Sequence, residues 1–184
     1  MSTVSEFPST RPGGWDDPGA APIPIPLRLH EATVGPQWVD YNGHMSEWCY
    51  LLVMGDSSDA FFRYVGIDDA YRAAGRSLYT VETHIRNLDE LAEGDRLALT
   101  LRVLGADAKR VHILHEVLAL DGDGTERAVA TGEQMLLHVD AAAGRTSPMP
   151  ATLQARVGAL REAHAALPRP EYVGRPMGLR GREG

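Results

Sequence analysis

The 184-residue chain contains a single cysteine, Cys49, and a single lysine, Lys109. One cysteine excludes an internal disulfide and a cluster of thiolate metal ligands. Long uninterrupted apolar runs are also missing, because Gly55 and Asp56 break the longest one, and this predicts that no segment spans a membrane. The first residues lack the basic and apolar regions of a secretory signal. We therefore expect a cytoplasmic protein.

Excess positive charge is absent as well, since the net charge is −7 and the pI is about 5.4. This balance argues against nucleic acid or an anionic membrane surface as a partner. The histidines and carboxylates are scattered without the spacing of metal ligands, so we predict neither a metal nor a cofactor. Asp121 to Thr125 resembles a calcium loop, but its twelfth position is Gly132 instead of glutamate, and we interpret it as a hairpin turn.

Composition predicts one globular domain, because 43% of the residues are hydrophobic and 23% are charged. Residues 1–24 are rich in proline and glycine and are expected to form a flexible arm. The domain should cover 25–167, and 168–184 has the composition of a loose C-terminal tail.

The stretch 38–66 carries the strongest signal in the chain. Its second part is apolar nearly all round and too long for one strand, which predicts a buried helix over 46–65 that ends at Gly66. A strand over 25–37 precedes it. Alternating residues predict four further strands, at 77–88, 96–104, 110–120 and 127–140. A final amphipathic helix is predicted at 151–167.

Most of these strands are joined by short turns, which implies antiparallel neighbours. The pattern therefore predicts an α+β fold in which one curved five-stranded antiparallel sheet wraps around one long buried helix. On the strand 77–88, we expect Tyr79, Val81, Thr83 and Ile85 on one face, with Leu78, Thr80, Glu82 and His84 on the other.

A loop that contains candidate catalytic residues lies directly before the long helix. Asp40 stands beside a turn formed by Asn42 and Gly43, both of which tolerate positive φ. The unpaired amides and the positive dipole end of the helix follow at once. An acid next to a site for an anionic intermediate is the arrangement that acyl transfer needs.

This pattern resembles the hotdog fold, and VDYNGHM at 39–45 is similar to the opening loop of the 4-hydroxybenzoyl-CoA-thioesterase branch. Three further segments extend the likeness and together resemble the betainyl-CoA thioesterases of carnitine metabolism: LYTVETHI at 78–85, LGADAKRVH at 104–112 and EQMLLHVD at 133–140. The resemblance implies a hydrolase that releases free acid and coenzyme A from a small acyl-CoA, most notably betainyl-CoA, without a cofactor.

The resemblance also implies roles for individual residues. Asp40 would attack the thioester carbonyl or activate the water that does so. The backbone amide at Glu47 would polarise the carbonyl oxygen, and Gly43 would allow close approach. Hotdog enzymes work as homodimers or homotetramers with active sites between subunits, so Glu82 and His84 could reach the loop of the opposite subunit.

A betainyl group would seek aromatic faces and a carboxylate for its trimethylammonium cation. Glu82 is the candidate counter-charge, and His44, Asn42 and His84 are further candidates for substrate contacts. The candidate aromatic side chains are Trp38, Tyr41, Trp48, Tyr50 and Tyr79.

Each of these residues has a structural alternative. Asp40 also fits an Asx-turn or a helix-cap acid, Asn42 and Gly43 fit turn geometry, and His44 fits a hydrogen-bonded loop histidine. Acids such as Glu47 are favoured in a first helical turn, although a catalytic carboxylate there is the other possibility. Glu82 and His84 also fit a solvent-facing pair, and the aromatic side chains fit core positions. The basic residues Arg102, Lys109 and Arg110 fit either coenzyme A phosphate ligands or a solvated hairpin.

Two other functions remain open at this point. One is a hotdog module that binds acyl-CoA without turnover, and the other is a hotdog enoyl-CoA hydratase or dehydratase that uses His84. A serine hydrolase is rejected, because Gly55 to Ser58 resembles the start of such a motif but the chain lacks the downstream Asp-x-x-His and Asn-Asp pairs that it needs.

Overall fold

The computed structural model describes residues 23–178, so the predicted arm over 1–24 lies almost wholly outside the described residues. The elements follow the predicted order, with one short strand added near the end. They are β1 Leu27–Thr33, the 3-10 turn Pro36–Trp38, α1 Glu47–Val65, α2 Asp69–Ala73, β2 Arg76–Asn87, β3 Arg96–Ala106, β4 Arg110–Leu120, β5 Glu126–Asp140, β6 Arg145–Thr146 and α3 Ala151–His164.

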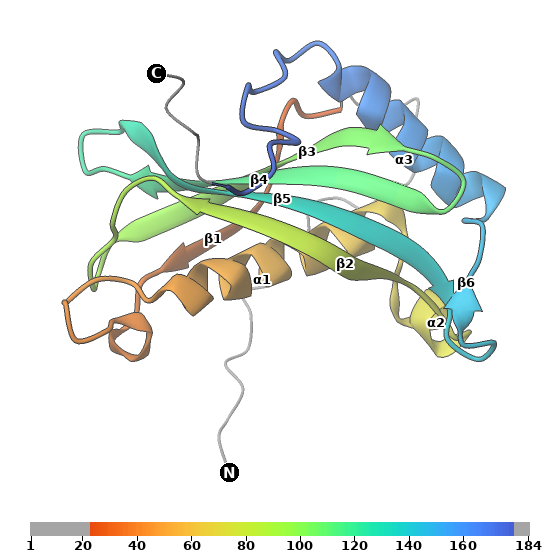
Figure 1. Cartoon of the computed structure of the whole chain (residues 1–184), viewed down its shortest axis with the longest axis horizontal. Helices are drawn as coiled ribbons and strands as arrows, with labels where there is room; N and C mark the ends of the chain where they lie inside the picture. Colours follow the sequence, from red (N-terminus) through yellow and green to blue (C-terminus); the bar gives the residue numbers. More distant parts are fainter. Residues whose placement is uncertain (1–22, 179–184) are drawn as a thin grey trace.

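The strands form one antiparallel sheet in the order β1-β3-β4-β5-β2, and the two-residue β6 pairs with β5. The β4–β5 turn uses Gly124 at φ +87°, a left-handed conformation that glycine adopts at low cost. The sheet curves around α1, which lies along its concave face (Figure 1). The predicted hotdog architecture is confirmed.

The side of α1 that meets the sheet forms the core. Phe61, Met54 and Val53 are fully buried against the inward residues of the strands, including Leu99 and Leu101. Gly66 ends the helix at φ +97°, where its N–H donates to the carbonyls of the last turn. Burial of this apolar surface is the main force that holds the helix to the sheet.

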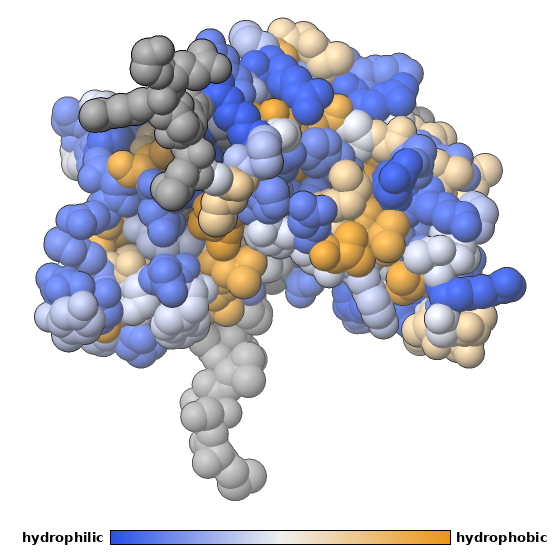
Figure 2. Space-filling view, in the orientation of Figure 1, coloured by the Kyte–Doolittle hydropathy of each residue, from blue (hydrophilic) through white to orange (hydrophobic). Residues whose placement is uncertain are grey.

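The expectation that α1 is buried all round is wrong. Its other side leaves Trp48, Leu51 and Leu52 exposed by 56%, 46% and 39%. In the space-filling view the surface is largely hydrophilic, but hydrophobic patches lie over α1 and over β2, where Tyr79 and Val81 are exposed (Figure 2). The fold therefore leaves apolar surface uncovered on the helix and on an edge strand.

A β-bulge changes the predicted faces of β2. Thr80 pairs with Leu136 and Glu82 with Met135, so Val81 is the extra residue between them. Because the bulge shifts the alternation by one position, Tyr79, Glu82 and His84 lie on the face turned away from α1. Thr83 and Ile85 lie on the face turned toward it, and the predicted division of this strand is wrong.

The segment that follows α3 is fixed to the sheet instead of forming a loose end. Tyr172 donates its hydroxyl to Glu116 (3.2 Å), and the backbone N–H of Gly174 donates to Glu133 (2.8 Å). Arg102, named above as a candidate coenzyme A phosphate ligand, is buried and donates to the carbonyl of Pro168 (2.9 Å). The segment 168–174 thus crosses the convex face of the sheet, which is not free for coenzyme A phosphates at Arg102.

Candidate active site

The loop before α1 holds Asp40 by means of its own backbone. The N–H of Asn42 donates to Oδ1 of Asp40 (2.7 Å), and the N–H of Gly43 donates to the Asp40 carbonyl (3.1 Å). Gly43 has φ +83°, which a residue with a side chain adopts only under strain. The Asx-turn is therefore present, and within residues 23–178 it leaves Oδ2 of Asp40 without a hydrogen-bond partner.

Neighbouring segments fix this loop in place. Met45 is buried and donates its N–H to the carbonyl of Leu91 (2.6 Å), while the N–H of Ser46 donates to the carbonyl of Trp38 (2.8 Å). His44 places Nε2 3.2 Å from a carboxylate oxygen of Glu90, as in the alternative of a bonded loop histidine. The position of Asp40 relative to the helix start is set by these contacts.

The N-terminus of α1 begins directly after this loop. Ser46 is the N-cap residue, yet its side chain makes no capping hydrogen bond. The amides of Glu47 and Trp48 belong to the first turn, where no intrahelical carbonyl is available to accept them. The side chain of Glu47 is exposed. The loop and the first turn together offer a carboxylate oxygen and backbone donors, which are the parts that stabilise a tetrahedral oxyanion.

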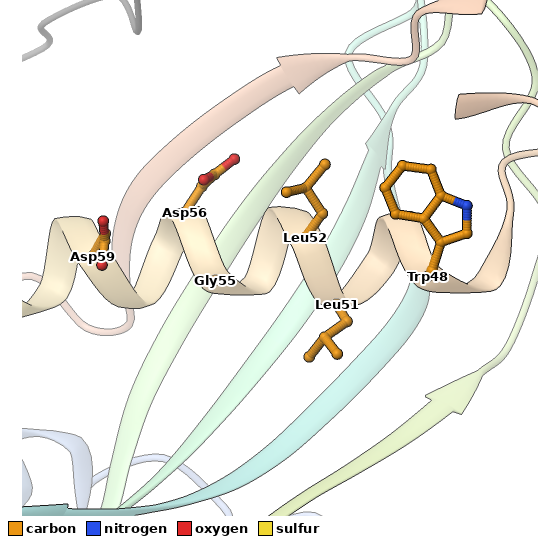
Figure 3. A pocket seen from close by; sticks show the side chains of 6 residues that line it. All are labelled: Trp48, Leu51, Leu52, Gly55, Asp56 and Asp59. Carbon is orange, nitrogen blue, oxygen red and sulfur yellow. The ribbon is translucent and has the colours of Figure 1, made fainter. Parts of the chain in front are cut away.

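An open groove with a volume of about 490 Å³ runs along the exposed side of α1. Figure 3 shows Trp48, Leu52 and Asp56 projecting from the same side of the helix. The remaining lining residues are Leu51, Gly55 and Asp59. The groove begins at the residue that follows Glu47 and continues away from the loop.

The predicted residues of β2 are not brought to this loop within one chain. Nε2 of His84 lies 3.0 Å from Oε1 of Glu82, and both side chains are well exposed on the convex face of the sheet. Tyr79 is exposed on the same face. No hydrogen bond or ion pair joins these three residues to the segment 40–48 in the part of the chain that the structure describes. Of the other aromatic candidates, Tyr50 is buried in the core and Tyr41 is almost fully exposed.

Two features of α1 were missed by reasoning from the sequence. One is Asp56, whose i, i+4 spacing from Leu52 and Trp48 was the available signal for a shared stripe. Nε2 of His30 on β1 lies 3.9 Å from Oδ2 of Asp56. Burial raises the pKa of Asp56 and lowers the pKa of His30.

The other is a buried polar cluster between α1 and the sheet. Ser58 lies 3.0 Å from Nε2 of His115 and donates its hydroxyl to Oε1 of Gln134 (3.2 Å). Nδ1 of His115 is buried and has no hydrogen-bond partner among the described residues. Burial lowers the pKa of His115 to about 4, so the ring is neutral near pH 7. No periodicity in the sequence distinguishes these residues from apolar core positions.

Within residues 23–178, the histidine, cysteine, aspartate and glutamate side chains form no group of three that could hold a metal ion. No helix within this range is long and apolar enough to cross a membrane.

Comparison with known proteins places this geometry in a family. A family profile described as the thioesterase-like superfamily matches residues 34–157. A protein of Agrobacterium fabrum named L-carnitine dehydrogenase/betainyl-CoA thioesterase is 50% identical over 156 residues, which cover 85% of this chain and 31% of that protein. The betainyl-CoA thioesterase of Pseudomonas aeruginosa is 47% identical over 154 residues, which cover 83% of this chain and 95% of that protein.

Among solved structures, a candidate thioesterase from Pseudomonas putida KT2440 is 33% identical, with a TM-score of 0.72 over 87% of this chain and 100% of that one. This chain therefore spans about a third of the length of the Agrobacterium protein and nearly all of the Pseudomonas aeruginosa one.

Proposed function

The chain belongs to the thioesterase-like superfamily, and from this premise we propose that it is an acyl-CoA thioesterase that hydrolyses betainyl-CoA to betaine and coenzyme A. The substrate is supported by the names of two relatives at 50% and 47% identity. We assign the reaction to the domain 25–167 and to the cytoplasm, with no cofactor.

The observation that carries this proposal is Oδ2 of Asp40, which has no hydrogen-bond partner within residues 23–178 and belongs to the loop directly before the first turn of α1. In one route the carboxylate attacks the carbonyl carbon and expels the thiolate, and water then hydrolyses the resulting anhydride. In the other route the carboxylate removes a proton from the attacking water, and the proton passes to the leaving thiolate. Both routes consume one water and yield a free acid and a thiol.

The carbonyl oxygen becomes negatively charged in either route. The backbone amide of Glu47 is the donor that stabilises it, because this amide lacks an intrahelical acceptor and lies at the positive end of the helix dipole. One such donor contributes on the order of a hundredfold in rate. Gly43 has no side chain to obstruct the substrate, since a Cβ there would meet nothing within 4 Å.

The functional unit in this proposal is a homodimer or homotetramer with active sites between subunits. β2 is an edge strand of twelve residues with exposed Tyr79 and Val81, and an unpaired edge of this kind suits pairing with a second copy. In such an assembly Glu82 and His84 of one copy serve the loop of the other. Asn42, His44, Trp48 and Tyr79 complete the proposed substrate contacts.

A thiol-release assay with betainyl-CoA tests the proposal. We expect Asp40→Asn to lower kcat at least a hundredfold with an unchanged melting temperature, because the amide still accepts the hydrogen bond from Asn42 but is neither nucleophile nor base. Asp69→Asn, at an almost fully exposed position on α2, is the matched control and should retain activity.

Three results would contradict parts of this proposal. An active Asp40→Asn with an inactive Glu47→Gln would move the chemistry to the helix. Tight binding of acyl-CoA without thiol release would indicate a binding module. Hydration of an enoyl-CoA without thiol release, abolished by His84→Ala, would indicate a hydratase.

A further inference from the structure

Two rows of residues line the groove, and both have a spacing of four residues along the helix. Trp48, Leu52 and Asp56 form one row, and Leu51, Gly55 and Asp59 form the other. Trp48, Leu52 and Asp56 stand out from the ribbon together (Figure 3). Gly55 leaves room between them, because a Cβ built there would meet nothing within 4 Å.

The chemistry of this lining favours a cation that cannot donate hydrogen bonds. The lining contains an exposed indole, two leucines and two carboxylates, and no basic residue. Asp56 makes no hydrogen bond within residues 23–178, and its side chain is only 23% exposed. Burial lowers the pKa of the neighbouring His30, which favours the neutral form of that ring. A quaternary ammonium group matches an aromatic face and a carboxylate that makes no hydrogen bond in the described part of the chain.

The groove is longer than a betainyl group needs. Asp56 follows Trp48 by eight residues, which separates their Cα atoms by about 12 Å. The betainyl nitrogen is two bonds from the carbonyl carbon, about 2.5 Å at about 1.2 Å per bond. With the carbonyl at the Glu47 amide, that nitrogen lies beside Trp48 and does not reach Asp56.

A longer acyl chain spans about half of this distance. A nitrogen four to six bonds from the carbonyl carbon lies about 5 to 7 Å along the groove, and its methyl groups extend farther. Helical side chains tilt toward the N-terminus, so the Asp56 carboxylate leans toward such a cation. The far end of the groove therefore has a carboxylate placed for substrates longer than betainyl-CoA.

We propose that the enzyme also hydrolyses longer ω-trimethylammonio acyl thioesters, whose cation lies between Trp48 and Asp56, and that Asp56 determines this preference. The inference rests on the proposed thioesterase function and extends it to a second class of substrate. Asp56 acts here as a specificity residue and takes no part in bond making or breaking.

The test is a thiol-release panel of two cationic thioesters and their neutral isosteres. The cations are betainyl-CoA and 4-(trimethylammonio)butanoyl-CoA, and the isosteres, with carbon in place of nitrogen, are 3,3-dimethylbutanoyl-CoA and 5,5-dimethylhexanoyl-CoA. The wild type should cleave the longer cation at least tenfold faster, by kcat/KM, than its isostere.

Asp56→Asn should then lower kcat/KM about tenfold for the longer cation, less than threefold for betainyl-CoA, and not at all for the isosteres. The variant should fold normally, since burial already raises the pKa of Asp56 and the amide carries no charge to bury. Asp69→Asn is the control for a change in net charge and should leave all four values unchanged.

Cleavage of betainyl-CoA with no preference for the longer cation over its isostere would overturn this inference and leave the proposed function intact. No thiol release from any of the four substrates would overturn both. An Asp56→Asn variant that loses activity equally on all four substrates and shifts its mass in light scattering would show that the groove is a subunit contact, which also overturns the inference.

Discussion

The two sides of α1 both carry apolar residues but differ in whether the sheet covers them. The side against the sheet is buried although it includes Ser57 and Ser58, and the side turned away is exposed although it includes Trp48 and Leu52. Burial alone explains the first side, because sheet residues cover it. The second side is uncovered apolar surface next to a candidate catalytic loop. One side of the helix thus supports the fold, and the other presents the groove.

The largest change in stability is expected when a residue of the inner side of α1 is truncated, and comparison with a residue of the groove side tests the difference between the two sides. Phe61→Ala removes a fully buried ring from the inner side and should lower the free energy of unfolding by about 4 kcal/mol in urea titrations. Leu52→Ala, on the groove side, should cost less than about 1.5 kcal/mol. Equal losses for the two variants would mean that the groove side is also part of a stable core.

The next effect concerns pH and the buried cluster on the inner side. The pKa of His115 is about 4 in the folded chain and about 6.5 when unfolded. Between these values the unfolded state binds the extra proton, so stability is complete above pH 6.5 and falls as the pH drops toward 4. Protonation would place an N–H on Nδ1, which has no acceptor in the described part of the chain.

The expected loss is about 3 kcal/mol across this window. Urea titrations of the wild type and of His115→Gln at pH 7.5 and pH 4.5 measure it, because His30 and His164 contribute equally to both proteins. A wild type whose stability falls no faster than that of His115→Gln would contradict the neutral, buried ring.

A smaller effect is expected from the indole on the groove side. Trp48→Ala should lower kcat/KM about tenfold for betainyl-CoA and about threefold for 3,3-dimethylbutanoyl-CoA, because only the cation loses an electrostatic attraction to the ring. The melting temperature should change little, since the indole is more than half exposed. Equal losses for both substrates would assign Trp48 a steric role only.

The smallest changes in stability are expected at two glycines, Gly55 on the groove side of α1 and Gly132 on β5 next to the inner side of α1. Gly55→Ala should stabilise the chain by up to about 1 kcal/mol, since alanine favours the helix and its Cβ meets nothing within 4 Å. Gly132→Ala on β5 should destabilise it by about 1 to 3 kcal/mol, because its Cβ would stand 2.3 Å from Sδ of Met54. Thermal denaturation of both variants, with opposite shifts expected, tests the difference.

The order of the strands and helices could be predicted because each has a clear period. Alternation marked the strands, and the uninterrupted apolar run from Trp48 to Val53 marked α1. The run did not predict which side of α1 packs against the sheet. Apolar residues surround the helix, and only the position of the sheet determines which of them are covered. The bulge at Val81 was equally hidden, because one extra residue in a strand leaves no mark in composition.

The candidate site divides in the same way. Asp40, Gly43 and Glu47 are close in sequence, so their proximity in space followed from the turn and the helix start. The cluster of Ser58, His115 and Gln134 joins three elements, and the neighbours Asp56 and His30 join two. Such contacts depend on strand register, which a single sequence does not specify.

Asp40 is oriented by the turn in which it lies, and no neighbouring side chain holds its carboxylate in the described part of the chain. Its geometry is consequently independent of the residues that line the helix beyond Glu47. Mutations that reshape the acyl site can accumulate without misaligning the acid. A loop of this kind can serve as a constant reactive head while natural selection or a protein engineer exchanges the recognition surface beside it.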